Sequence, residues 1–274
     1  MSVKVSIILP TYNGAKNIEK AIRSVIDQSF KDWELLIIDD GSTDNIKTVL
    51  IPFIKEESRI LYIKNESNLG IQKSLNLGLS FAKGEYIARI DDDDEWIDKD
   101  KLKKQVEFLD LNPDYVLVGT GTIAVVETGE KVCEYRLPEK DENIRKEILF
   151  KNCFIHSSVM FRKEIVLDVG GYDENESFKH IEDYHLWLLL GQKGKMANLP
   201  DLMVNFMIGN HGISSNNKLD QLKKDIRLIR LYKSLYPNYW IALFSRKIFV
   251  LLFRIFNALP NKFKLSLIGR YKSF

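Results

Sequence analysis

Short apolar runs alternate with helical patterns over the first hundred residues of the chain. The apolar runs are rich in β-branched residues and predict four strands, over residues 3–9, 33–38, 60–63 and 86–90. Between them, apolar residues recur at helical spacing and predict helices over residues 18–26, 46–54 and 71–82. Strands that alternate with helices are typical of βαβ units, so we expect an α/β domain with a mostly parallel central sheet flanked by helices.

Beyond residue 113 the pattern becomes mainly strand-like, and we expect antiparallel additions to the same sheet. It predicts strands over residues 115–118 and 122–126, a helix over 142–150, and an apolar run over 156–161. A further helix should begin near Glu182. Because no repeat or low-complexity linker interrupts this region, residues 1–217 are predicted to form one domain.

The remaining segment, residues 218–274, differs from that domain in charge. The chain has a formal net charge of +2, yet this segment holds 13 Lys or Arg against 2 Asp or Glu. Its apolar spacing predicts two helices, near residues 222–232 and 241–256, and basic residues interrupt the second too often for a bilayer span. We expect a basic C-terminal helical extension that either contacts an anionic membrane or packs on protein, in this chain or a second subunit. The acidic body does not suggest a nucleic-acid partner.

The two cysteines, Cys133 and Cys153, stand apart without the spacing of a disulfide framework or a structural zinc site. This favours a reducing, cytoplasmic setting. The first ten residues are too short and too interrupted by Lys4 for a signal peptide, so we interpret them as a strand.

Four consecutive aspartates, Asp91 to Asp94, directly follow the fourth predicted strand. Asp91 and Asp93 would point the same way if strand geometry persists. Ligands of parallel sheets bind at the carboxyl ends of strands, and carboxylates suit Mg²⁺ or Mn²⁺. The run therefore predicts a metal site, and the alternative is a solvated acidic turn that caps the next helix.

Two neighbouring loops offer groups for a nucleotide. Asp39, Asp40 and Ser42 follow the second strand and provide acceptors for a base or a ribose, or else form an ordinary βα turn with a hydroxyl cap. Tyr12 and Asn13 follow the first strand. The ring of Tyr12 could stack on a nucleobase or simply cover the loop.

Two candidates come from the second half of the chain. Glu182 and Asp183 open a predicted helix, whose amides would hold them as anions; they are either a general base with its neighbour or ordinary caps. His211 lies in a loop kept open by Gly212 and serines, and is the candidate histidine for a metal or phosphate contact.

Taken in order, these segments resemble the family-two glycosyltransferases with the GT-A fold, a family that includes bacterial polysaccharide-building enzymes. The resemblance covers residues 2–215 and rests on four motifs: Pro10-Thr11-Tyr12-Asn13-Gly14, Ile38-Asp39-Asp40-Gly41-Ser42-Thr43-Asp44, Gly84-Glu85-Tyr86 with Asp91-Asp92-Asp93-Asp94, and Glu182-Asp183-Tyr184. It implies a GT-A catalytic domain over residues 1–217. Residues 97–100 depart from the family, which commonly has a proline there, so the start of the next helix is not predicted.

The resemblance also implies roles for the candidate residues. Tyr12 and Asp40 would hold the nucleobase, and Asp91 would lie near the ribose. Asp183 would deprotonate the acceptor hydroxyl, with Glu182 beside it in the acceptor pocket. The nucleotide-sugar loops would further include Pro10, Asn13, Asp39, Ser42 and Asp92. The divalent ion, Mn²⁺ or Mg²⁺, would be bound by Asp93 and His211.

The implied function is an inverting, metal-dependent transfer of one sugar from a nucleotide sugar, a UDP-sugar by preference, to a hydroxyl of a glycan or lipid-linked acceptor in cell-surface polysaccharide synthesis. The Gln-x-x-Arg-Trp motif of processive relatives is absent, which predicts one sugar per encounter. We also expect the protein to lie in the cytoplasm at the inner face of the cell membrane and to form a homodimer. The rivals are a sugar-phosphate nucleotidyltransferase and a noncatalytic carbohydrate-binding protein with the same fold.

Overall fold

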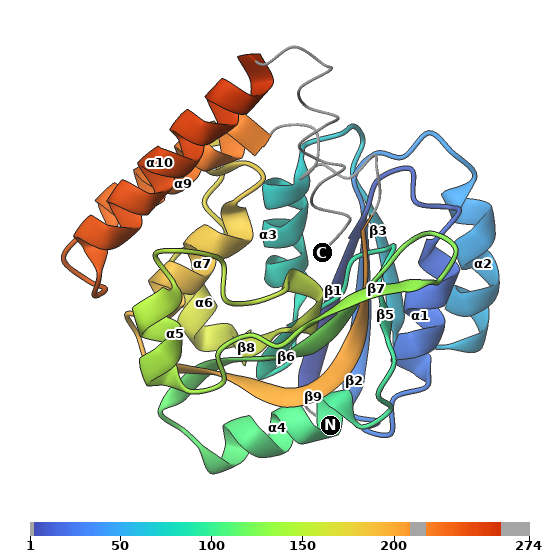
Figure 1. Cartoon of the computed structure of the whole chain (residues 1–274). Helices are drawn as coiled ribbons and strands as arrows, with labels where there is room; N and C mark the ends of the chain where they lie inside the picture. The colour runs from blue at the N-terminus through green and yellow to red at the C-terminus, as the bar shows by residue number, and fades with distance from the viewer. Residues whose placement is uncertain (1–2, 209–217, 259–274) are drawn as a thin grey trace.

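A single sheet forms the centre of the computed structural model, which describes residues 3–208 and 218–258. Within these residues the sheet has nine strands in the order β3-β2-β1-β4-β8-β6-β9-β5, and β7 pairs with β6 (Figure 1). The strands are β1 Val5–Thr11, β2 Trp33–Asp39, β3 Ile60–Lys64, β4 Tyr86–Arg89, β5 Glu95–Trp96, β6 Tyr115–Val125, β7 Lys131–Tyr135, β8 Met160–Arg162 and β9 Lys195–Met207.

The first four strands pair in parallel, and their order reverses at β1. The chain passes from β1 to β2 and β3 on one side, and then returns to place β4 on the other side of β1. Ile8 of β1 lies level with both Leu36 of β2 and Arg89 of β4. Such a reversal separates the loops that follow two neighbouring strands, and open α/β sheets bind ligands there.

Helices cover both faces of the sheet (Figure 1). Side chains alternate along β1, so that Ile7 and Leu9 face one core and Ile8 faces the other. The first core contains α1 (Ile18–Ile26), α2 (Ile46–Glu56) and α4 (Lys101–Leu111). The second contains α3 (Ile71–Phe81), α5 (Asp141–Glu147), α6 (Lys163–Asp168) and α7 (Glu182–Leu190). Two short 3₁₀ helices precede β8 and α7, at His156–Ser158 and Glu176–Phe178.

The βαβ units predicted from the apolar pattern are confirmed. The four strands and three crossover helices occur in the predicted order, with ends that differ by one or two residues; β1, for example, begins at Val5 and continues to Thr11. The helix predicted near Glu182 begins at that residue as α7.

Beyond residue 113 the prediction is wrong in three places. Strand β6 is a single strand rather than two, because Gly119 and Gly121, which interrupt the apolar run, are buried within it. Strand β9 was not predicted, because Pro200 and Asp201 interrupt its alternating pattern. In the structure, the pairing of β9 with β6 shifts register near Gly121 and so accommodates these two residues. The pairing is also mixed: β5, β7 and β8 are antiparallel to their neighbours, whereas β6 and β9 are parallel.

The two helices predicted in the basic segment are present as α9 (Lys218–Leu231) and α10 (Tyr239–Ala258). Leu228 and Ile229 of α9 are buried in the same core as α7. The hydroxyl of Tyr236 donates to the carbonyl of Leu188 in α7 at 2.8 Å. No helix among residues 3–208 and 218–258 is both long enough and apolar enough to cross a bilayer.

Candidate active site

The acidic run lies at the carboxyl end of β4, where its first member pairs with a buried arginine. Asp91 forms an ion pair with Arg89, whose side chain is only 2% exposed. The backbone N–H of Asp91 donates to Ser157 Oγ at 2.9 Å. Arg89 and Asp91 are two residues apart, so strand alternation directs both toward the α7 side of the sheet.

Two further carboxylates of the run are held by other elements. Thr11 Oγ1 donates to Asp92, and Gly14 approaches so closely that a Cβ there would lie 2.0 Å from Asp92 Oδ2. Asp94 is buried and accepts from the backbone N–H of Met207 at the end of β9, at 2.8 Å. Asp92 and Asp94 therefore fix the acidic turn to β1 and β9.

Asp93 and Asp94 carry the charges of the run that are least well accommodated, and burial raises the pKa of Asp94 well above its usual range. Burial, followed by the charges of Asp91 and Asp92, raises the pKa of Asp93 to about 7. Burial also raises the pKa of Asp92 to about 6. A divalent cation would relieve this repulsion. Among the described residues, no group of three or more His, Cys, Asp or Glu is arranged around a common metal position.

The second loop is built around Asp40, which is buried at the end of β2. Its carboxylate accepts three hydrogen bonds at 2.9 Å, from the side chain of Asn65 and from the backbone N–H groups of Leu69 and Gly70. Gly41 has a φ of 76°, and a Cβ there would lie 2.5 Å from the backbone of Ser67. A carboxylate can accept about four hydrogen bonds, so Asp40 retains capacity for a ligand donor.

The other polar residues of these loops mainly hold one another. Asn13 donates its backbone N–H to Ser42 Oγ at 2.9 Å, and its side-chain oxygen accepts from Thr43 N–H at 2.9 Å. Asp39 accepts from the backbone N–H of Ser42 at 2.7 Å and from the Tyr62 hydroxyl at 2.6 Å. The first two loops therefore form one joined surface beside the acidic run.

Tyr12 and Pro10 differ sharply in exposure. Tyr12 is 51% exposed on this joined surface, so its ring is open to contact a planar ligand. Pro10 is buried in β1, and the pairing of β1 with β4 ends beside it, where Ile90 donates to the carbonyl of Ile8 at 3.3 Å. Because proline has no N–H, it cannot extend this ladder.

The two carboxylates of α7 occupy the first turn of that helix. Burial and then the charge of Asp183 raise the pKa of Glu182 to about 7, and Glu182 Oε2 is buried without a hydrogen-bond partner among the described residues. Burial also raises the pKa of Asp183, against the lowering effects of the Tyr184 N–H and of Asn152, which donates at 2.8 Å. Burial therefore outweighs the helix amino terminus, which we expected to keep Asp183 strongly acidic.

The acidic run and the α7 carboxylates both lie within electrostatic range of Arg89. The charge of Asp91 raises the pKa of Asp183, which shows that the two groups lie within electrostatic range. Arg89 lowers the pKa of Asp93 and Glu182 as well as that of Asp183. One buried cation thus offsets carboxylates that lie far apart in the sequence.

Sequence reasoning missed Arg89, Ser157 and Asn152. Arg89 had a usable signal, because it is the one charged residue in the apolar strand β4 and stands two positions before an aspartate. Ser157 and Asn152 had none, since their roles depend on contacts with distant segments. His211 lies outside the described residues.

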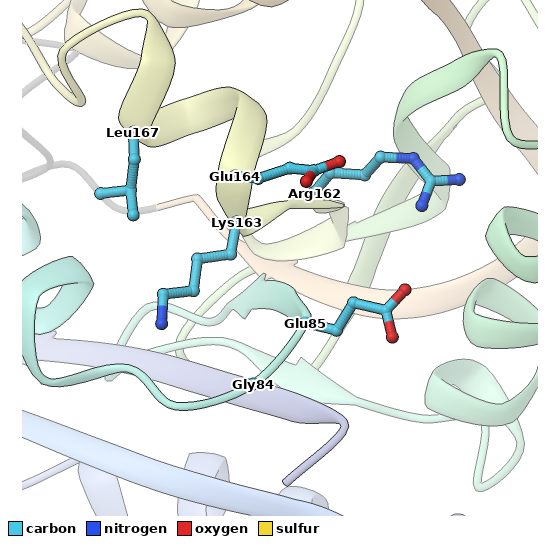
Figure 2. Close-up of a pocket in the computed structure, with 6 residues that line it drawn as sticks. All are labelled: Gly84, Glu85, Arg162, Lys163, Glu164 and Leu167. Carbon is cyan, nitrogen blue, oxygen red and sulfur yellow. The ribbon is translucent and has the colours of Figure 1, made fainter. Parts of the chain in front are cut away.

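A separate cavity of about 450 Å³ lies at the opposite end of β4 (Figure 2). It is lined by Gly84, Glu85, Arg162, Lys163, Glu164 and Leu167. Glu85 and Asp91 are about 20 Å apart if the strand rises 3.3 Å per residue, so this cavity is not part of the acidic site.

A family model described as glycosyl transferase family 2 matches residues 6–170. The chain belongs to this family. Among curated relatives of this glycosyltransferase, the amylovoran biosynthesis glycosyltransferase AmsE of Erwinia amylovora is 30% identical over 82% of this chain and 84% of its own length. The Escherichia coli enzyme WfgD, named as a UDP-Glc:alpha-D-GlcNAc-diphosphoundecaprenol beta-1,3-glucosyltransferase, is 32% identical over 80% of this chain and 83% of its own length.

Solved structures establish the fold of this family-two glycosyltransferase as GT-A. TarS of S. aureus covers 89% of this chain and 71% of the TarS chain with a TM-score of 0.68 and 21% identity. The mannosyltransferase PcManGT of Pyrobaculum calidifontis, solved with GDP-Man and Mn²⁺, covers 90% of this chain and 69% of its own with a TM-score of 0.67 and 16% identity. The family assignment favours a glycosyltransferase over the nucleotidyltransferase and noncatalytic rivals.

Proposed function

We propose that this glycosyltransferase moves one sugar from a nucleotide sugar, with UDP-sugars preferred, to a hydroxyl of a glycan or lipid-linked saccharide, with inversion at the anomeric carbon. The observation that carries the proposal is that two groups of carboxylates, distant in the sequence, lie within electrostatic range of the same buried residue, Arg89. One group follows β4, and the other opens α7. A donor diphosphate needs charge neutralisation and an acceptor hydroxyl needs a base, and the two groups supply one function each.

Asp183 is the base in this proposal. The acceptor oxygen forms a bond to the anomeric carbon while the bond from that carbon to the diphosphate oxygen breaks. The bonding electrons leave with the nucleoside diphosphate, and the acceptor proton passes to the Asp183 carboxylate. Burial raises the pKa of Asp183, which strengthens it as a base, and the hydrogen bond from Asn152 fixes the orientation of its carboxylate.

Glu182 would assist in binding the acceptor. Its pKa of about 7 means that near neutral pH a substantial fraction carries a proton, so its buried Oε2 can donate to or accept from an acceptor hydroxyl. An acceptor without that hydroxyl would leave the oxygen unpaired, which favours a sugar over an apolar alcohol.

The nucleoside would occupy the joined surface of the first two loops. The exposed ring of Tyr12 can stack on the base, and the remaining capacity of Asp40 suits the ring N–H of uracil. Asp91 would lie near the ribose. Pro10, Asn13, Asp39, Ser42 and Asp92 would hold the shape of this surface.

A divalent cation, Mn²⁺ or Mg²⁺, supplies neutralisation of the diphosphate when bound. Asp93 would hold it, and the repulsion that raises the pKa of Asp93 supports this role. His211 is a further candidate ligand. The PcManGT structure, solved with GDP-Man and Mn²⁺, supports a metal in this fold.

The relatives support a place in polysaccharide synthesis. AmsE is named for amylovoran biosynthesis, and the name of WfgD specifies a UDP-Glc donor and a GlcNAc-diphosphoundecaprenol acceptor. On this basis we propose a growing cell-surface saccharide as the acceptor.

Release of nucleoside diphosphate from a panel of UDP- and GDP-sugars, with Mn²⁺ or Mg²⁺ and a lipid-linked saccharide acceptor, tests the proposal. Asp93→Ala and Asp183→Asn should each lower kcat at least a hundredfold, of the order expected for lost electrostatic or base catalysis. Asp114→Asn is the matched control, because this acid pairs with Lys195 at 2.7 Å on the surface.

Binding separates the two roles. A donor with metal should raise the Tm of Asp183→Asn as it does for the wild type, whereas Asp93→Ala should lose the metal-dependent part of that shift. Normal turnover by both variants would refute the assignment of the site. A product that retains the donor's anomeric configuration would refute the single displacement.

A further inference from the structure

Helix α10 has apolar side chains on two opposite faces. The inner face packs on the protein, with Ala242 and Leu243 buried in the core that also contains α7 and α9. The second face, here called the outer face, consists of exposed side chains: Trp240, Phe244, Ile248, Leu251, Leu252 and Ile255. Trp240 is 76% exposed and Phe244 is 68% exposed, although such residues are usually buried.

The outer face forms a continuous apolar stripe. At about 100° per residue its side chains fall within an arc of about 120° on a helix about 30 Å long, and no polar residue falls within that arc. Lys247 and Arg254, both exposed, follow just beyond one edge of the arc. A stripe of this size exceeds the scattered apolar residues of an ordinary surface and indicates an interaction site.

The charge around the stripe indicates the partner. Residues 226–258, which include α10, contain six Lys or Arg and no Asp or Glu. A second copy of this chain would bring the same positive charge to the contact, which disfavours self-association through this face. An anionic lipid surface, in contrast, attracts the cations and accepts the apolar stripe, and exposed aromatics with flanking basic residues are typical of interfacial helices.

We propose that α10 lies in the interface of an anionic phospholipid membrane, with its outer face at the acyl boundary and Lys247 and Arg254 among the headgroups. This divides the basic segment into two parts with different partners. Helix α9 binds the protein through Leu228 and Ile229, and only α10 contacts lipid.

The contacts of α10 also fix the catalytic body relative to the membrane. Arg246 pairs with Asp225 of α9 at 3.2 Å and donates to the carbonyl of Phe150. The carboxyl end of α10 lies on the side of the molecule toward which β1 runs (Figure 1), and β4 is parallel to β1. One further step rests on the proposed function. If the acceptor is a lipid-linked saccharide, its lipid remains in the membrane to which α10 binds.

Sedimentation of the full-length protein with vesicles at low salt tests the proposal. One set of vesicles contains 30% phosphatidylglycerol in phosphatidylcholine, and the other contains phosphatidylcholine alone. The wild type should sediment with the anionic vesicles and be released by high salt, because the cations contribute. Phe244→Glu/Leu252→Glu should bind at least tenfold more weakly, with an unchanged Tm because both side chains point away from the protein.

The matched control, Leu61→Glu/Leu111→Glu, changes two exposed apolar residues on other elements and should bind like the wild type. Three results would overturn the proposal: a wild type that stays in the supernatant, equal binding to neutral vesicles, or an outer-face variant that loses a dimer in size-exclusion chromatography but still binds vesicles. Vesicle binding requires no turnover. Its failure therefore leaves sugar transfer untouched, and a failure of donor turnover leaves the membrane result intact.

Discussion

Replacement of Arg89 by methionine removes the buried cation of the acidic site while keeping much of its length. The Arg89 side chain is 2% exposed and that of its partner Asp91 is 34% exposed. Removal of one partner from a buried ion pair costs about 3–5 kcal/mol. Because water can stabilise part of the Asp91 charge, we expect Arg89→Met to lower the free energy of unfolding by about 2–3 kcal/mol at pH 8.

Urea denaturation of a double-mutant cycle measures this effect. The effects of Arg89→Met and Asp91→Asn should be non-additive. The free energy of unfolding of the double variant should be higher, by about 1 kcal/mol or more, than the sum of the two single losses predicts. Arg23→Met is the control, since its pair with Glu19 is exposed on a helix and should contribute less than about 0.5 kcal/mol. Additive changes, or a loss below about 1 kcal/mol for Arg89→Met, would refute the view that this arginine offsets the carboxylates.

The pH dependence gives a second measurement of the same property. The folded-state pKa of Asp92 is about 6 and that of Asp93 is about 7, both above the value of an unfolded aspartate. Between about pH 4 and pH 7 these two groups therefore bind more protons in the folded state than in the unfolded state, and their contribution to the free energy of unfolding falls as pH rises through this window. At pH 5.5 fewer negative charges remain for Arg89 to offset, so the cost of Arg89→Met should be smaller than at pH 8.

Mn²⁺ should raise the wild-type Tm more at pH 8 than at pH 6, because the pKa of Asp93 is about 7 and protons then compete less; an equal shift would argue against Asp93 as the ligand. Gly14→Ala should lower kcat/KM at least tenfold, since its Cβ would lie 2.0 Å from Asp92 Oδ2; unchanged kinetics would mean that Asp92 can move freely. Asn152→Ala removes a hydrogen bond that lowers the pKa of Asp183, so the acid limb of the kcat/KM profile should move to higher pH. A fixed limb would show that another group titrates there.

Periodicity was sufficient for the first four strands and the three helices between them, because their apolar residues recur at regular strand or helix spacing. It failed for β9, where Pro200 and Asp201 break the pattern and the neighbouring strand shifts register to accommodate them. That compensation comes from a strand distant in the sequence, and no local window contains it.

The sequence placed the candidate residues in neighbouring loops but did not predict their electrostatics. The loops after β1, β2 and β4 were expected to meet because parallel strands end at one edge, and they do. The raised pKa of Asp183, in contrast, depends on burial by segments that the sequence does not place. For the same reason, the helical spacing of α10 predicted a helix but did not separate its inner face from its outer face.

Pro10 stands where the pairing between β1 and β4 ends. Extending the register of Ile8 with Arg89 by two residues would set Pro10 level with Asp91 and bring the first aspartates into the ladder. Side chains alternate along a strand, so half of the carboxylates would then be turned into an apolar core. Because Pro10 lacks an N–H, the pairing cannot extend in this way. A residue with an N–H at this position would allow the acidic turn to pair with β1 and so bury part of its charge in the core.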